Sequence, residues 1–181
     1  MRSDSHVRRY WLVLVPLALA GIATLAVAIN AGAGNKPRCF GKEATKVGND
    51  NSNTITGTNQ KDVIVAGDGN DSVDARGGND LVCSGLGADG VEGGPGNDKI
   101  NGGFSADDLD GDTGLDNQEG DGNDLIKADK GADRVEGQGG DDELYGGRNN
   151  DVLDGQSGDA DFCDGGTSSD NVDNCELGPG D

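Results

Sequence analysis

The chain has 181 residues, of which 34 are glycine and 3% are aromatic, so large apolar side chains are too few for a conventional globular core. Its 34 acidic and 14 basic residues give a formal net charge of -20, which argues against nucleic acid as a partner because such partners require basic surfaces. This composition is also typical of disordered chains, unless cations bind at fixed positions.

Residues 1–28 have the features of a targeting segment. Arg2, Arg8 and Arg9 precede an uncharged apolar run from Tyr10 to Ile29, and small residues near its end provide a cleavage site. We therefore predict a signal peptide and a secreted, extracellular protein. The run is also long enough to span a bilayer, so a retained N-terminal anchor and a cell-surface location are the alternative. Contact with a membrane is expected only if the segment is not cleaved.

Residues 29–56 are predicted to be a linker followed by an N-terminal cap. From residue 39 the segment keeps a nine-residue phase with the units that follow, because Ile55 falls in the place of their apolar residue. Asn53, however, occupies the place where those units have aspartate.

Residues 57–173 form an array of nine-residue units, counted from Gly57, with aspartate in the sixth place. One unit before Asp124 is a residue short, and a one-residue insertion precedes Asp161. The sixth-place aspartates are Asp62, Asp71, Asp80, Asp89, Asp98, Asp107, Asp116, Asp124, Asp133, Asp142, Asp151, Asp161 and Asp170.

The eighth place of the units is apolar, apart from Gln118 and Cys163, and glycine recurs in the fourth place, where turns often require a positive φ. Units with Gln60, Ser105, Asn149 or Ser168 in the fourth place depart from this pattern. The apolar row consists of Ile64, Val73, Val82, Val91, Ile100, Leu109, Ile126, Val135, Leu144, Leu153 and Val172.

These units resemble the hemolysin-type, or RTX, calcium-binding nonapeptide G-G-x-G-x-D-x-U-x. Residues 93–101, which read GGPGNDKIN, match it at every fixed place. The resemblance implies an all-β fold, a right-handed parallel β-roll or β-solenoid, with short N- and C-terminal caps. It also implies that each unit divides into a six-residue turn and a three-residue strand whose middle side chain points inward.

In such a roll, units n and n+2 stack about 4.8 Å apart, and their aspartates face each other. Two carboxylates at that distance repel, whereas calcium takes 6 to 8 oxygen ligands and turns the repulsion into attraction. We therefore predict that the sixth-place aspartates bind several Ca²⁺ ions and that binding and folding are coupled. Counting every unit places Asp62, Asp80, Asp98, Asp116, Asp133, Asp151 and Asp170 on one edge, and the remaining aspartates on the other.

The four cysteines all lie beyond residue 28, and their even number suggests two disulfides in an exported protein. Cys163 and Cys175 are 12 residues apart and would close a short loop across the last unit, with Cys175 inside the predicted C-terminal tail at 174–181. Cys39 would then pair with Cys83 by elimination, which ties the cap to the early repeats. The alternative is that one pair stays reduced or bonds to another chain.

Catalysis is not expected, because the only histidine lies at position 6, before the predicted cleavage point, and the acids are repeated rather than placed in contrasting environments. Aromatic residues are too few to form a recognisable hot spot for a protein partner. Two functions remain: a secreted calcium-binding protein, and a membrane-anchored structural or adhesive surface module stiffened by calcium.

Overall fold

The computed structural model describes residues 36–113, 121–158 and 160–177. The predicted signal peptide at 1–28 and the predicted ligand Asp116 lie outside these residues. The described residues contain no helix of the length and hydrophobicity needed to cross a membrane.

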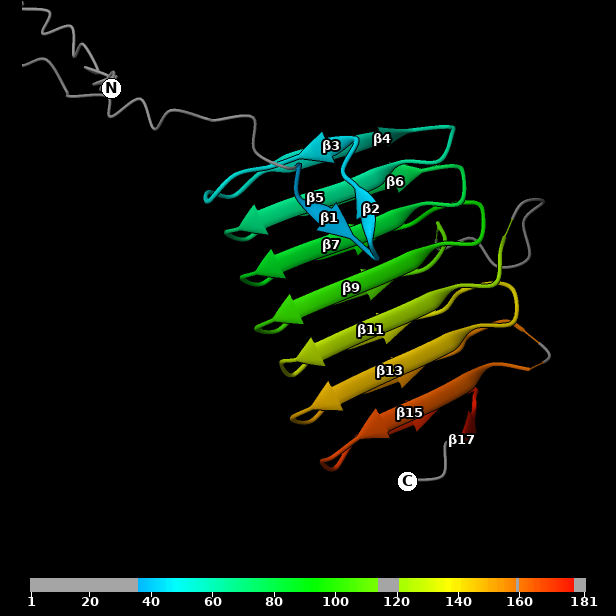
Figure 1. Cartoon of the computed structure of the whole chain (residues 1–181). Helices are drawn as coiled ribbons and strands as arrows, with labels where there is room; N and C mark the ends of the chain where they lie inside the picture. Colours follow the sequence, from blue (N-terminus) through cyan, green and yellow to red (C-terminus); the bar gives the residue numbers. More distant parts are fainter. Residues whose placement is uncertain (1–35, 114–120, 159, 178–181) are drawn as a thin grey trace, which may run out of the picture. The chain divides into compact units, whose positions relative to one another are not determined.

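Parallel strands stack into two sheets, so that the chain visits the sheets alternately as it winds (Figure 1). The even sheet contains β4 (Thr54–Thr58), β6 (Ser72–Arg76), β8 (Gly90–Glu92), β10 (Asp108–Asp110), β12 (Arg134–Glu136), β14 (Val152–Asp154) and β16 (Asn171–Asp173). The odd sheet contains β3 (Lys46–Val47), β5 (Val63–Asp68), β7 (Leu81–Leu86), β9 (Lys99–Phe104), β11 (Leu125–Lys130), β13 (Glu143–Arg148), β15 (Phe162–Gly166) and β17 (Glu176–Leu177). This confirms the predicted all-β parallel roll.

Strand length differs between the two sheets, which the nine-residue period did not reveal. The strands from β8 to β16 in the even sheet have three residues, as predicted, but β5, β7, β9, β11 and β13 have six. The prediction was wrong for alternate units because their strands continue into the first places of the next unit. Gly67, Gly85 and Gly103 accordingly pair in register beyond the apolar residues.

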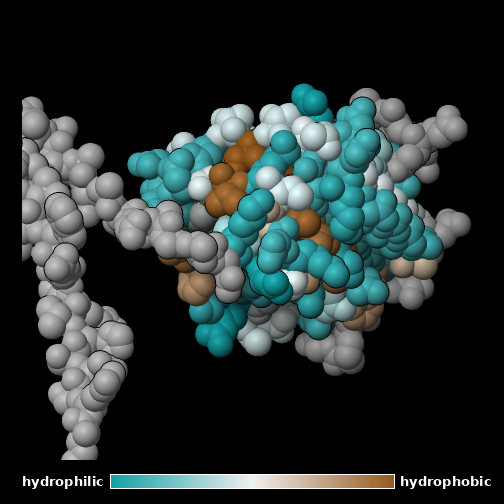
Figure 2. Space-filling model, turned by 45° about the horizontal axis from the view of Figure 1, so that its top comes forward, coloured by the Kyte–Doolittle hydropathy of each residue, from teal (hydrophilic) through white to brown (hydrophobic). Residues whose placement is uncertain are grey.

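The eighth-place side chains form the core, as predicted. They point between the sheets in two in-register rows, one from each sheet. Ile64, Val82 and Ile100 belong to the row of the odd sheet and are fully buried. Cys163 is also fully buried and continues the apolar row, whereas Val172 at the end of the even sheet is only partly buried. Outside this core the surface shown in Figure 2 is mostly hydrophilic, with small separate hydrophobic patches.

The irregular region before Asp124 is an insertion rather than a short unit. Away from this region, paired residues of stacked strands are 18 or 19 positions apart between β3 and β16, and 14 positions apart in the last pair, β15 and β17. In contrast, β9 pairs with β11, and β10 with β12, at a spacing of 26. One turn therefore carries eight additional residues, and the chain then returns to the sheet that it would have reached without them. The predicted alternation of edges is consequently wrong for every unit after the insertion.

The cap covers the outer face of the odd sheet at its N-terminal end. β1 (Arg38–Cys39) and β2 (Lys42–Glu43) form an antiparallel hairpin that crosses in front of β5 and β7 (Figure 1). Cys39 is buried there against Val63 and Leu81 and is bonded to Cys83, which points outward from β7. The hairpin thus shields apolar side chains that would otherwise be exposed to solvent.

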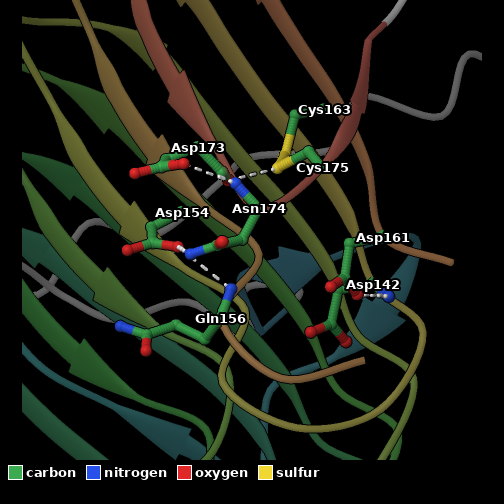
Figure 3. Close-up of a disulfide and its surroundings, with 8 residues drawn as sticks. All are labelled: Asp142, Asp154, Gln156, Asp161, Cys163, Asp173, Asn174 and Cys175. Carbon is green, nitrogen blue, oxygen red and sulfur yellow. Dashed lines mark hydrogen bonds between the residues drawn. A yellow bond between two sulfur atoms is a disulfide. The ribbon is translucent and has the colours of Figure 1, made fainter. Parts of the chain in front are cut away.

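The predicted disulfide pairing is confirmed at both ends of the roll. Cys39 and Cys83 have their Cα atoms 5.7 Å apart and tie the hairpin to β7, the third strand of the odd sheet. Cys163 and Cys175, also with Cα atoms 5.7 Å apart, join the last turn to the core (Figure 3). Both ends of the stack, where strands lack one neighbour, are therefore cross-linked.

The second place of most units has a left-handed backbone, which the sequence does not always supply with glycine. Gly85 has a φ of 120°, but Arg76, at the same place in an earlier unit, has a φ of 71° and side-chain exposure to solvent. Left-handed φ values are strained for residues with a Cβ atom. The fourth place behaves similarly, because Ser105 and Asn149 adopt φ values of 84° and 80°.

We predict that Arg76→Gly stabilises the roll by about 1 kcal/mol, because it removes this strain and loses only an exposed ion pair with Asp74. Gly85→Ala should destabilise it by roughly 1 to 3 kcal/mol, because its new Cβ would overlap the backbone carbonyl of Gly67. Thermal unfolding followed by circular dichroism in excess calcium measures both changes. Opposite signs are expected, and a lower melting temperature for Arg76→Gly would contradict the strain argument.

Candidate metal centres

The sixth-place aspartates line the two edges of the roll, each placed immediately before a strand. The first edge, which leads into the odd sheet, holds Asp62, Asp80, Asp98, Asp124, Asp142 and Asp161. The second edge, which leads into the even sheet, holds Asp71, Asp89, Asp107, Asp133, Asp151 and Asp170. Asp124, Asp142 and Asp161 have therefore exchanged edges with Asp133, Asp151 and Asp170 relative to the prediction, because of the insertion.

One oxygen of each stacked carboxylate is used by the backbone of the preceding coil. Oδ1 of Asp98 accepts a hydrogen bond from the amide of Asp80 at 2.7 Å, and Oδ1 of Asp161 accepts one from the amide of Asp142 at 2.9 Å (Figure 3). Ten such contacts join aspartates of successive coils, with donor–acceptor distances of 2.6 to 3.0 Å. The aspartates thus connect the coils directly, a role that the sequence analysis did not anticipate.

The second carboxylate oxygen has no hydrogen-bond partner in most of these residues, although it is buried. Burial of an unpaired carboxylate oxygen is costly unless a proton or a cation lies against it. The unpartnered Oδ2 atoms belong to Asp71, Asp80, Asp89, Asp98, Asp107, Asp124, Asp133, Asp142, Asp151 and Asp170.

Glycine in the first place makes room for these free oxygens. A Cβ atom added to Gly93 would lie 2.6 Å from Oδ2 of Asp98, and one added to Gly102 would lie 2.6 Å from Oδ2 of Asp107. In the fourth place, a Cβ atom on Gly96 would overlap the backbone carbonyl of Gly78 in the coil below. Backbone carbonyl oxygens of stacked turns are therefore packed closely at the same edge as the carboxylates.

These features fit a hard cation with many oxygen ligands. Among the described residues, no group of three acidic, histidine or cysteine side chains is arranged to hold a metal on its own. An ion at the edge would combine carboxylate oxygens with backbone carbonyls and water, which is the ligand set that calcium accepts and that zinc does not favour.

The electrostatic environment also favours a cation. Burial, together with the neighbouring charges of the stacked carboxylates, raises the pKa of Asp98 to about 8 and that of Asp124 to about 9. Burial likewise raises the pKa of Asp107 and of Asp142 to about 7. At neutral pH, carboxylates of this kind hold a proton or need a counter-ion.

Asp62 differs from the other sixth-place residues. Its Oδ1 accepts a hydrogen bond from the hydroxyl of Thr45 at 3.0 Å, and its Oδ2 accepts bonds from the amide and the hydroxyl of Thr58. Its role as a metal ligand stays a prediction, as does that of every sixth-place aspartate. Asn53 precedes Asp71 on the second edge. Its backbone amide donates a hydrogen bond to Oδ1 of Asp71 at 2.7 Å, so Asn53 occupies the place of an aspartate without adding charge.

Aspartates outside the sixth place are mostly exposed to solvent, and Asp110 and Asp154 are two that make further contacts. Asp68, Asp74 and Asp108 are exposed. Asp110 is only partly exposed, and its Oδ1 is buried without a hydrogen-bond partner, 3.8 Å from the guanidinium of Arg134. Asp154 accepts hydrogen bonds from the amide of Gln156 and the side chain of Asn174 at the C-terminal end of the roll (Figure 3).

Asp112 is a buried acid that the sequence analysis missed. It lies in the second place of the unit that carries the insertion, and its side chain is 2% exposed. The interrupted phase after this unit was the available signal, but it was interpreted as the loss of one residue rather than as the gain of eight.

A family comparison identifies the repeats. The model of the RTX calcium-binding nonapeptide repeat (4 copies) matches residues 47–82, 84–117 and 120–153, which together make up more than half of the chain. The chain belongs to this RTX repeat family. No curated protein and no solved structure gave a match. The first matched segment begins at β3, where the roll begins, and ends just before Cys83. Calcium ions are accordingly the partner that the family supports.

Acid should stabilise the roll when calcium is absent. The folded pKa values of Asp98, Asp107 and Asp124 lie far above the unfolded value of about 3.9, so the folded chain binds protons more tightly than the unfolded chain. Stability from this source is lost as pH rises through about 7 to 9 and gained as pH falls toward 4. In chelator, we expect β-sheet signal to increase as pH is lowered from 9 to 5.

At a fixed calcium concentration below saturation, the same protons compete with the ion, so the apparent calcium affinity should fall over that pH range. Circular dichroism and calcium titration at matched pH values test both statements. A chelated chain that loses β-sheet signal on acidification would show that these carboxylates do not carry the effect.

Proposed function

We propose that this chain is a secreted calcium-binding protein whose RTX repeats bind several calcium ions between stacked turns and fold on binding. The observation that carries the proposal is the pair of edge columns in which one carboxylate oxygen holds the neighbouring coil and the other is buried without a partner. Stacked carboxylates and closely packed glycine carbonyls supply the oxygen ligands that calcium requires.

Coupling between binding and folding follows from the balance of charges at these edges. No ion pair among the described residues joins a lysine or arginine to a sixth-place aspartate, and the ion pairs present lie on exposed side chains such as Arg38 and Arg134. Adjacent carboxylates in a column repel by about 1 kcal/mol in bulk water and by more where water is excluded. The core contributes only one large apolar side chain per strand, so we expect it to be insufficient to overcome this repulsion without bound cations.

The proposed role is non-catalytic. The RTX roll is a structural fold, and the carboxylates that could act as acids or bases are repeated along both edges in similar surroundings. A catalytic pair requires groups whose environments separate their pKa values and a cleft that holds the substrate. Similar carboxylates repeated at every turn suit the binding of one ion after another along the roll, whereas a single active site would not need them.

A calcium titration tests the central claim. We expect the purified chain to be mostly unfolded in chelator and to gain β-sheet signal by circular dichroism with a midpoint on the order of 0.1 to 1 mM calcium at neutral pH. Asp98→Asn keeps a hydrogen-bond acceptor for the amide of Asp80 but removes a negative charge, so isothermal titration should show at least one ion fewer.

Asp108→Asn is the matched control, because Asp108 is exposed on β10 and its side chain forms a hydrogen bond and ion pair, within the described part of the chain, with Arg134 alone. Its ion count should equal that of the unmodified chain. A sheet-like spectrum that chelator does not alter would refute coupled folding, and equal losses in the two variants would refute the assignment of the sixth-place ligands.

Export is tested at the N-terminus. If residues 1–28 are a signal peptide, protein recovered from the culture medium of the producing cells should begin close to residue 29, as measured by N-terminal sequencing or intact mass. Protein that stays with the membrane fraction and retains its first residues would instead support the anchored surface module.

A further inference from the structure

The insertion between β10 and β11 leaves a buried acidic group that no regular turn of the roll contains. The fourth-place glycines Gly96 and Gly122 stack on each other, as Gly78 and Gly96 do one coil earlier, although 26 residues rather than 18 separate them. The eight additional residues therefore fall, in the sequence, between Asp112 and Gly122. Asp112 lies just before this departure.

Asp112 is placed differently from its counterparts in other turns of the first edge. Arg76, Gly94, Gln138 and Gln156 occupy the same place and have φ values between 67° and 85°. Asp112 does not adopt a positive φ, and its carboxylate is buried rather than exposed. The sequence at this turn thus positions an additional carboxylate within the edge.

The carboxylate of Asp112 connects the two ends of the insertion. Its Oδ2 accepts a hydrogen bond from the amide of Gly122 at 3.1 Å, across ten residues of sequence. Its Oδ1 is buried and has no hydrogen-bond partner among the described residues. One oxygen therefore closes the base of the insertion, and the other is available to a ligand.

The surroundings of Asp112 are uniformly acidic. Asp112 experiences the negative charges of Asp121 and Asp142, and Asp124 experiences those of Asp98, Asp112 and Asp142. Oδ2 of Asp124 and Oδ2 of Asp142 are also buried without partners. No ion pair of the described residues involves Asp98, Asp112, Asp124 or Asp142. A regular turn offers the carboxylates of two stacked coils, whereas this turn offers a third.

We propose that Asp112 adds a third negative charge beside the cation site formed by Asp124 and Asp142, which makes this site the tightest calcium site of the roll. This inference rests on the proposed calcium-binding function. Calcium affinity rises with the number of charged ligands. No three acidic side chains of the described residues are grouped to hold one ion together, so Asp112 strengthens binding through its charge, while backbone carbonyls and water complete the ligand set.

Asp112→Asn in the full chain tests this role, because asparagine can still accept the bond from Gly122 while the charge is lost. Calcium titration against a chromophoric chelator should show that the tightest site weakens by roughly tenfold or more. The β-sheet signal at saturating calcium should be unchanged. Asp129→Asn is the matched control, since Asp129 also occupies a second place but is exposed, and its titration should equal that of the unmodified chain.

Asp89→Asn removes charge from a regular turn on the second edge and should weaken a later phase of the titration while leaving the tightest site intact. Asp112→Glu, which restores the charge, should recover much of the lost affinity. Unaltered tight binding in Asp112→Asn would overturn the proposal. Equal damage by Asn and Glu would also overturn it, because the effect would then reflect packing. An unmodified chain that binds no calcium would instead refute the proposed function itself.

Discussion

The hydrogen bond from a backbone amide to an aspartate carboxylate in the next coil is the contact on which the rest of the roll depends. It fixes the separation of stacked turns, and it explains why aspartate rather than asparagine or glutamate recurs in the sixth place. The side chain must be short enough to reach the amide one coil below, and it must carry a second oxygen. Asn53, which stands in the place of an aspartate, shows what asparagine does there. Its side-chain oxygen accepts a hydrogen bond from the backbone amide of Asn49 in its own turn, and the side chain carries no charge. Each coil is therefore held by its neighbour through a group that still carries an uncompensated charge.

The nine-residue period predicted most of the fold. It correctly placed the buried aliphatics, because a strand side chain at a fixed place in every unit must face the same side of the sheet. The positions of the cysteines predicted both disulfides, since Cys163 and Cys175 are close in sequence and the remaining two cysteines had no other partners. The positions of the carboxylates along the chain needed no structural information.

The partners of these carboxylates across the coils were harder to predict. An eight-residue offset fits either one short unit or one insertion, and both keep aspartate and isoleucine in phase. Only the pairing of β9 with β11 distinguishes them, because strand pairing depends on how the turn closes in space and not on the repeat. Asp112 was overlooked for the same reason. Its burial is created by the closure of the insertion, through Gly122, and no local pattern in the sequence records that contact.

The insertion has a consequence for how this architecture can change. Eight residues enter one turn, yet the strands on either side keep the register of the coils above and below them. Loops can therefore be added at a turn without moving the hydrophobic rows or the neighbouring turns. Since each coil contacts only the adjacent ones, the tolerance of one turn does not depend on distant turns. Each turn of the roll can therefore gain a surface segment independently of the others, while the stacked strands keep their positions.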